Sequence, residues 1–562
     1  MHSKAKFGFK LFLLLAIFLA LTACSSTPQN VDNNAVQTNK QVAKTSTANK
    51  LGADVIRFLF TADLQSRFLP FNATVKIDGK KQKLELGGFA RLMTALENAR
   101  ATATNSITVS GGDDTLGRFF NYFNGVATMQ LLEKMKYEVI CPGNHEFDKG
   151  ETVYAAALRD TKFAVICANA EFHNRGLRRR IKPHIVKQVG GYKVGFFGLI
   201  IPYLRVTTSI DKETKIATDL AKIASEQIKT LKSEGADIIV ALTHLGLKAD
   251  VELANQITGI DIILGAHSHK YTEKPVIAKH LDGSQTIVIN GGERAKFLCQ
   301  LDATLHKTEK SVKIVKTDYK LIPINADLAE HKEIKKVVEE YLKQLPPEQV
   351  IATTPVFLNG EREDIRNKST NLGNFICDAI LQRFKNQADF AIYNSGGIRC
   401  SIKKGDIKVS TLEEMLPFGN TITILTLTGK DVILAFEHCA ATKSGKSNDG
   451  KISNGAFLQV SKNVKAVFDT AKKAQQMNDD STKIIFPGER IKQLLINGQE
   501  VQPDKTYRVA TNSYVANGGN GYVMFKGKKA IDTFLTTLEV IVEAVKRLKK
   551  IEPTSEQRLI FK

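Results

Sequence analysis

The chain has 562 residues, which is more than one hydrophobic core organises, so the length predicts two large domains. Apolar residues make up 43% of the chain and there are only 14 prolines, a composition that excludes a largely disordered protein. Lysine and arginine exceed aspartate and glutamate by 79 to 58, and the net charge of +21 suits anionic partners. The densest basic run, residues 178–180, has no interleaved aromatics, so we interpret it as a solvated face and expect no nucleic-acid partner.

The first residues predict a targeting segment. Three lysines within the first ten residues precede the apolar run LFLLLAIFLALTA, which is too short to span a bilayer comfortably. The run ends in LTAC (21–24), which resembles the lipobox of bacterial lipoproteins. That resemblance implies a signal peptide over 1–23 and a lipid on Cys24, which would anchor the protein to a bacterial membrane facing the periplasm or the cell surface. A plain signal peptide is the alternative, and the polar residues 24–50 indicate a flexible tether.

Six cysteines remain beyond Cys24, at positions 141, 167, 299, 377, 400 and 439. They stand singly and include no CxxC pair, so they indicate neither a zinc knuckle nor a disulfide framework.

After residue 50, short apolar strands alternate with amphipathic stretches. The predicted strands are residues 55–60, 106–110, 137–140, 163–168, 192–200, 237–243, 261–265 and 286–290. A helical pattern over 217–235 ends at Gly235. This alternation of strand and helix predicts α/β architecture.

Titratable and amide side chains follow several of these strands. They are Asp63, Asp113, Asn144, His145, His244, His267 and His269. In α/β sheets, sites collect at the carboxyl ends of the strands. Carboxylate, amide and imidazole groups suit divalent cations, and a carboxylate such as Asp113 can bridge two ions that together assist phosphoryl displacement. A single histidine after a strand is usually structural, so the prediction depends on the repeated pattern.

The motifs that carry these residues are FTADLQ (60–65), SGGDD (110–114), GNHEFD (143–148), LTHLG (242–246) and GAHSH (265–269). They resemble the calcineurin-like metallophosphoesterases and, more narrowly, the bacterial 5'-nucleotidase/UDP-sugar hydrolase family. The resemblance implies a four-layer α/β/β/α catalytic domain over 51–324 and two divalent ions, with Mn, Zn, Co and Mg all open. It implies that one ion is held by Asp63, Gln65, Asp113 and His269. It implies that the other is held by Asp113, Asn144, His244 and His267.

The same resemblance gives His145 and Asp148 a catalytic role. His145, oriented by Asp148, would stabilise charge on the phosphoryl group or protonate the leaving oxygen. Glu146 is expected to be structural. One position departs from the family pattern, because Gln65 stands where relatives usually have histidine. His269 closes a motif that ends in glutamine in some relatives, so it would restore the missing imidazole; loss of metal contact at Gln65 is the alternative.

In the second half, residues 325–350 have the pattern of a charged connector helix closed by Pro346 and Pro347. Four later segments, 361–381, 394–407, 416–421 and 512–522, resemble the family's substrate-binding domain, which implies an α+β fold over 351–562. The residues implied to bind phosphate, base or sugar are Arg362, Arg366, Arg399, Phe418, Asn420, Tyr514 and Asn520. Guanidinium groups suit phosphate oxygens, and aromatic rings stack on a nucleobase. The plainer interpretations are surface ion pairs for Arg362 and Arg366 and core packing for the aromatics. Relatives often carry aspartate at the position of Asn520.

Taken together, the sequence predicts an exported, lipid-anchored hydrolase that removes phosphate from nucleoside 5'-phosphates, with no obligate protein partner. Cleavage of pyrophosphate bonds in UDP-sugars or NAD, or of 2',3'-cyclic nucleotides, stays open as an alternative. A surface lipoprotein that binds nucleotides without hydrolysing them is the alternative outside enzymes.

Overall fold

The computed structural model describes residues 50–309, 311–442 and 454–562, and contacts group residues 49–562 into one compact unit. The predicted signal peptide, Cys24 and nearly all of the predicted tether lie outside the described residues. Within the described ranges, no helix combines the length and apolarity that crossing a bilayer requires.

Two β-sheets make up the centre of the first half. The first has seven strands in the order β17 (Val312–Pro323), β16 (Phe297–Lys307), β1 (Val55–Thr61), β4 (Asn105–Ser110), β5 (Val139–Ile140), β6 (Ala164–Ile166) and β8 (Ile181–Lys182). The second has six in the order β14 (Val276–Lys279), β15 (Gln285–Asn290), β13 (Ile262–Gly265), β12 (Ile238–His244), β10 (Tyr192–Ile200) and β9 (His184–Val189). The run from β1 to β8 is parallel, and so is the run from β10 to β15. Each run therefore ends along one edge of its sheet.

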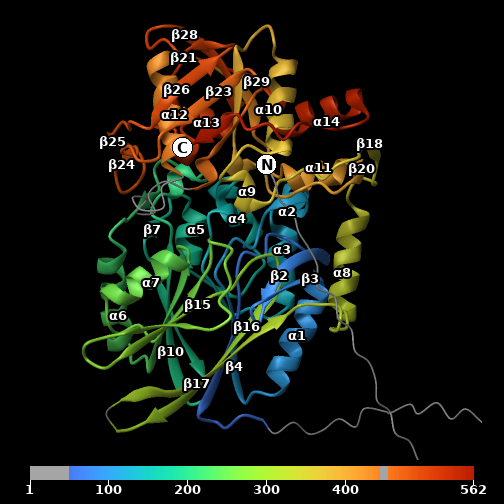
Figure 1. The fold of residues 1–562 in the computed structure, drawn as a ribbon. Helices are drawn as coiled ribbons and strands as arrows, with labels where there is room; N and C mark the ends of the chain where they lie inside the picture. The colour runs from blue at the N-terminus through green and yellow to red at the C-terminus, as the bar shows by residue number, and fades with distance from the viewer. Residues whose placement is uncertain (1–49, 310, 443–453) are drawn as a thin grey trace, which may run out of the picture. The chain divides into compact units, whose positions relative to one another are not determined.

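The two sheets pack face to face through one apolar core that includes Phe58, Phe60, Phe196, Val240 and Leu264. Helices cover both outer faces. On the first sheet lie α1 (Phe89–Ala101), α3 (Val126–Lys134) and α4 (Glu151–Ala157), and on the second lie α6 (Leu220–Ser233) and α7 (Leu247–Gln256). The predicted four-layer α/β/β/α arrangement is confirmed (Figure 1).

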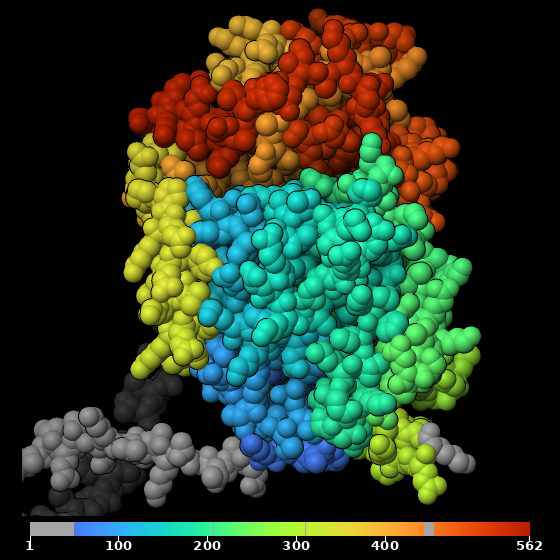
Figure 2. Space-filling view, turned by 180° about the vertical axis from the view of Figure 1, so that it is seen from behind, coloured from blue at the N-terminus to red at the C-terminus, as the bar shows by residue number. Residues whose placement is uncertain are grey.

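The predicted connector is helical only over α8 (Lys332–Lys343). The His331 side chain accepts a hydrogen bond from the Ile334 amide at its start, and the helix ends before Pro346. Ile334 and Val338 are buried in the core shared with α1 and α3, so α8 packs along the first half (yellow in Figure 2). Its charged residues face solvent, which explains the polar appearance of the segment.

The second half is α+β, as predicted. A five-stranded sheet has the order β22 (Leu458–Val460), β19 (Phe390–Asn394), β28 (Thr506–Asn512), β21 (Thr421–Thr428) and β29 (Ala530–Thr536). A four-stranded sheet has the order β27 (Gln499–Glu500), β26 (Ile491–Ile496), β23 (Val464–Phe468) and β30 (Leu559–Phe561). The longer helices here are α10 (Asn371–Arg383), α12 (Gly429–Ala441) and α14 (Thr537–Leu548).

Candidate active site

The loops after the parallel strands have an unusual backbone. Six non-glycine residues there have positive φ angles of 48 to 77°: Asp63, Gln65, Ser66, Asp113, His267 and His269. Left-handed backbone is unfavourable for residues with a Cβ, and such positions cluster where a site requires a particular side-chain direction. Most of the residues predicted as metal ligands are therefore held in strained turns.

These turns bring the predicted ligands of the first half together. The Asp113 Oδ2 atom lies 3.1 Å from His244 Nε2, and donor atoms of Asp113, His244 and His267 all lie within 4.8 Å of one another. Next to them, Asp63 Oδ1 lies 3.4 Å from His269 Nε2, and Gln65 Nε2 lies 3.2 Å from the same ring nitrogen.

Three buried atoms of this cluster fit a cation. Asp63 Oδ1, Asn144 Oδ1 and His244 Nε2 have no hydrogen-bond partner among the residues that the structure describes. Buried polar atoms are nearly always hydrogen-bonded, so three such atoms in one cluster need another partner. Carboxylate oxygen, amide oxygen and imidazole nitrogen are ligands of divalent ions, and the residues therefore fit a metal centre.

Burial and neighbouring charges set the protonation of the cluster. Burial raises the pKa of Asp113, but His244 and His145 lower it by more, so this carboxylate is ionised. Burial lowers the pKa of His244, but Asp113 raises it to about 10. Burial lowers the pKa of His267 and of His269 well below the ordinary value, so both rings are neutral. Neutral imidazole and ionised carboxylate are the forms that ligate metals. Asp113, His267 and His269 are in these forms, whereas His244 and Asp63, whose pKa is raised by burial, would each release a proton to a bound ion.

His145 lies at the rim of this cluster. Its Nδ1 atom is 2.7 Å from Asp148 Oδ2, and Asp148 Oδ1 accepts a hydrogen bond from the Thr208 hydroxyl at 3.2 Å. Its Nε2 atom is 3.8 Å from Asp113 Oδ2. Burial lowers the pKa of His145, but Asp148 and then Asp113 raise it by more, so the pKa lies above its ordinary value. The arrangement favours a positively charged ring facing the cavity.

Glu146 joins two of the loops. Its carboxylate accepts hydrogen bonds from the amides of Asp113, Gly143 and Thr115 at 2.9, 2.7 and 3.1 Å. These bonds fix the turn that carries Asn144 and His145 against the turn that carries Asp113.

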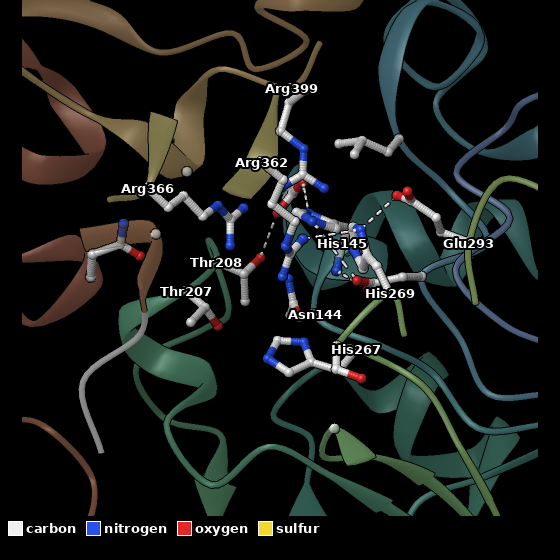
Figure 3. A pocket seen from close by; sticks show the side chains of 18 of the residues that line it. Asn144, His145, Thr207, Thr208, His267, His269, Glu293, Arg362, Arg366 and Arg399 are labelled. Carbon is white, nitrogen blue, oxygen red and sulfur yellow. Dashed lines mark hydrogen bonds and ion pairs between the residues drawn. The ribbon is translucent and has the colours of Figure 1, made fainter. Parts of the chain in front are cut away.

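The metal cluster opens into a cavity of about 1300 Å³ that also contacts the second half. Arg362 and Arg366, from α9 (Arg362–Ile365) and its C-cap, and Arg399 reach into it (Figure 3). Burial lowers the pKa of each arginine, and neighbouring arginines lower the pKa of Arg366 and Arg399 further, while Glu293 opposes the shift at Arg362. Three crowded guanidinium groups favour an anion between them. Arg362 and Arg366 line this cavity, and Arg366 is buried.

The other predicted substrate residues line the same cavity. Phe418, Asn420, Tyr514 and Asn520 contribute to its wall. The Phe418 ring centroid is 5.7 Å from that of His145 and 5.9 Å from Arg399 Cζ. The Tyr514 hydroxyl donates to Asn520 Oδ1 at 2.9 Å and accepts from the Asn520 amide at 3.0 Å. Phe418 and Tyr514 are both half-buried, and Tyr514 also packs against the core of the second half.

The sequence prediction missed three residues of the site. The Tyr203 hydroxyl lies 3.2 Å from His267 Nε2, Glu293 Oε2 lies 2.6 Å from His269 Nδ1, and Arg294 Nε donates to Gln65 Oε1 at 3.2 Å. The signal was present, because GGER (291–294) directly follows the predicted strand 286–290 and Tyr203 follows the strand 192–200.

This four-layer fold, with its carboxylate, amide and histidine cluster at the strand ends, defines a metal-dependent phosphoesterase. Residues 56–271 match the calcineurin-like phosphoesterase family, and residues 350–527 match the 5'-nucleotidase C-terminal domain. The chain therefore belongs to the 5'-nucleotidase family; it is a hydrolase of phosphoric esters that uses divalent metal ions.

Individual relatives agree with this assignment. The trifunctional nucleotide phosphoesterase protein YfkN of Bacillus subtilis is 32% identical over 84% of this chain, which spans only 34% of that longer protein. A 5'-nucleotidase of Diplobatis ommata is 29% identical over 90% of both chains. The crystal structure of the 5'-nucleotidase precursor from Thermus thermophilus has a TM-score of 0.79 and 28% identity, and covers 90% of this chain and 99% of its own.

Proposed function

We propose that the protein removes phosphate from nucleoside 5'-phosphates outside the cytoplasm. The observation that carries this proposal is that one cavity is lined by the metal cluster, three crowded arginines and two half-buried aromatic rings. A nucleotide has one complementary group for each of these features: a phosphate for the arginines and metals, and a base for the rings.

The proposed ion sites follow the observed clusters. The first would be held by Asp63, Gln65, Asp113 and His269, and the second by Asp113, Asn144, His244 and His267. When bound, the two ions would polarise the phosphorus centre and lower the pKa of an attacking water. The buried atoms without hydrogen-bond partners among the described residues, Asp63 Oδ1, Asn144 Oδ1 and His244 Nε2, support this assignment, since they come from both sets.

The side chains of the chain itself would bind and orient the substrate. Arg362, Arg366 and Arg399 would hold phosphate oxygens, and Phe418 and Tyr514 would stack on the base, which contributes about 1–3 kcal/mol per base. His145 would carry a proton on Nε2, towards the phosphoryl group or the leaving oxygen, because Nδ1 is engaged by Asp148.

Location and domain boundaries complete the proposal. We propose that Cys24 carries a lipid after cleavage of residues 1–23, that residues 51–324 and 351–562 are the catalytic and substrate-binding domains, and that residues 325–350 connect them. Mass spectrometry of the membrane-extracted protein and of a Cys24→Ser variant would test the anchor. An unmodified Cys24 in the parent would contradict it.

The deciding experiment is phosphate release from a panel of substrates after chelation and re-addition of Mn, Zn, Co, Mg or Ca. We expect AMP to be hydrolysed when one of the transition ions or Mg is restored, and an oligonucleotide to be resistant. UDP-glucose, NAD and 2',3'-cyclic AMP in the same panel distinguish the alternatives within the family. Binding of AMP without any metal-restored release would instead identify a nucleotide-binding protein without hydrolase activity.

A further inference from the structure

Two adjacent residues, Glu293 and Arg294, lie directly behind the proposed first ion site. They follow β15, whose register with β13 places Asn290 beside Gly265, so the turn after β15 meets the turn that carries His269. Both turns end at the same edge of the sheet, where the ligands converge (Figure 3). Neither residue belongs to the ligand set proposed above.

Glu293 is attached to the His269 ring. Its Oε2 atom lies 2.6 Å from His269 Nδ1, its Oε1 atom lies 2.7 Å from Lys296 Nζ, and only 16% of its side chain is exposed. A carboxylate at Nδ1 accepts the Nδ1 proton, so the lone pair of the ring is on Nε2, where the Gln65 amide nitrogen also lies, 3.2 Å away. The His269 Nε2 atom is the nitrogen that faces Asp63 Oδ1 at 3.4 Å.

The contact with Glu293 also decides whether His269 Nδ1 can form a hydrogen bond with Arg362. Arg362 Nη1 also lies 3.0 Å from His269 Nδ1. When His269 Nδ1 donates its proton to Glu293, it cannot also accept a proton from Arg362. The Glu293 carboxylate is closer to Nδ1 than the Arg362 guanidinium, and its negative charge attracts the Nδ1 proton. The guanidinium of Arg362 therefore keeps its donors for an anion in the cavity.

Arg294 makes the corresponding contact to Gln65. Its Nε atom donates to Gln65 Oε1 at 3.2 Å, and its backbone amide donates to the Asp63 carbonyl at 2.7 Å. An amide oxygen has two lone pairs, so this bond fixes the direction of Oε1 and leaves one lone pair for a cation. The far end of the side chain, Nη2, donates to the Arg399 carbonyl at 2.9 Å and so reaches the second half of the chain.

We propose that Glu293 and Arg294 are positioning residues of the first ion site: Glu293 orients the imidazole of His269, and Arg294 orients the amide of Gln65. The inference rests on the two-ion assignment of the proposed function. It predicts that one ion depends on this pair of residues while the other does not, since His269 and Gln65 both belong to the first ligand set alone.

The test is a Co²⁺ titration of the full metal-free chain, followed by the visible absorption spectrum. In Glu293→Gln and in Arg294→Met, we expect one of two Co²⁺ equivalents to bind about 10- to 100-fold more weakly and its absorption band to change, with the second equivalent unaffected. Glu293→Asp, which keeps the charge, should retain part of the affinity. The exposed Glu273→Gln and Lys274→Met are controls for the same loss of charge.

A double substitution tests whether Glu293 acts through the ring. In a His269→Gln background, Glu293→Gln should cost no further Co²⁺ affinity, because there is no imidazole left to orient. Circular dichroism of the metal-free variants and the unchanged second equivalent report folding in the same samples. If both equivalents bind to Glu293→Gln and Arg294→Met as tightly as to the parent, the inference is wrong. If the parent binds no Co²⁺ or releases no phosphate from AMP, the proposed function itself fails.

Discussion

His145 is engaged by carboxylates on two sides, and this arrangement determines its protonation. Asp148 contacts Nδ1 at 2.7 Å, while Asp113 lies 3.8 Å from Nε2. Burial alone would favour the neutral ring, so the raised pKa is a property of the two acids. A cationic ring can stabilise phosphoryl charge and can also donate a proton, which are the two roles proposed for it.

Replacement of His145 tests the two roles together. We expect His145→Asn to lower kcat for AMP by about 10²- to 10⁴-fold, the usual contribution of a general acid, with Co²⁺ binding unchanged. Steady-state kinetics and a Co²⁺ titration measure the two quantities. A variant with parental kcat would remove His145 from the chemistry.

Replacement of Asp148 tests whether this carboxylate controls the protonation of His145, through the pH dependence of kcat. The raised pKa keeps His145 protonated to higher pH, so its contribution is present at low pH and lost as pH rises through that pKa. In Asp148→Asn the pKa falls, and the alkaline limb of the kcat–pH profile should move to lower pH. The loss of activity should therefore be larger at pH 8 than at pH 6. An unshifted alkaline limb would show that Asp148 does not control His145.

The expectation that functional residues gather at the carboxyl ends of strands predicted most residues of the candidate site, but not all of them. Asp63, Asp113, Asn144, His267 and His269 follow parallel strands of the two sheets, and His244 is the last residue of one. Glu293 follows such a strand too, but a lone Glu-Arg pair in a glycine-containing turn resembles an ordinary polar loop. Its contact with His269 depends on the register between β13 and β15, which local sequence does not encode.

Among the secondary-structure elements, the turn after β5 leaves no room for a side chain at Gly143. A Cβ there would lie 2.2 Å from Asp113 Oδ1 and 2.5 Å from His244 Cε1. The turn must come this close because Glu146 ties its amide to the Asp113 loop. The glycine in GNHEFD is thus required by packing against the metal ligands.

We therefore expect Gly143→Ala to reduce bound metal at least about tenfold, because Asp113 and His244 must move apart to admit the methyl group. Metal content after equilibrium dialysis measures this directly. Gly191→Ala is the matched control, since a methyl group there would meet no described atom within 4 Å beyond its chain neighbours. Parental metal content in Gly143→Ala would mean that the loop yields without disturbing the ligands.

Helix α8 is a second informative element, because it resembles a solvated connector and yet has a buried stripe. Replacing Ile334 by alanine should destabilise the chain by about 2–5 kcal/mol, the cost of a cavity at a fully packed position. The midpoint of urea unfolding of the metal-free protein should fall accordingly, while exposed Lys336→Ala should have little effect. A midpoint unchanged by Ile334→Ala would show that α8 is not part of the core.

The strands could be predicted because buried parallel strands appear as continuous apolar runs between polar segments. The predicted strand over 137–140 contains only the two-residue β5, and the one over 163–168 contains only β6. Pairing with neighbours, rather than local composition, sets those lengths. The predicted connector over 325–350 likewise contains only the 12-residue α8.

In the molecule as a whole, Arg118 of α2 (Gly117–Phe123) joins the two halves. Its Nε atom lies 2.8 Å from Glu413 Oε2, and its Nη1 and Nη2 atoms contact Glu348 Oε1 at 3.1 Å and the Pro346 carbonyl at 2.8 Å. Only 14% of the Arg118 side chain and 11% of Glu413 are exposed. The contact therefore links α2 to both the end of the connector and α11 (Val409–Met415).

Loss of the Arg118 contact should weaken substrate binding, because the two halves would spend less time in the relative position that forms the substrate site. In Arg118→Met, we expect the KM for AMP to rise several-fold, since apparent affinity falls with the fraction of competent molecules. Co²⁺ binding should not change, because every proposed ligand lies in the first half. Arg383→Met, which breaks an exposed ion pair within the second half, is the control. Unchanged KM in Arg118→Met would show that the contact does not govern the substrate site.

The division of the cavity between two stretches of sequence has a consequence for biogenesis. All the proposed ion ligands lie within residues 63–269, whereas the first arginine that lines the cavity is residue 362. Because domains tend to fold in order as a chain emerges, the cation centre can assemble before any phosphate-gripping group exists. A partly emerged polypeptide would thus bind its metal ions before it can bind a nucleotide. It would become able to bind nucleotides only once the last third of the chain has folded.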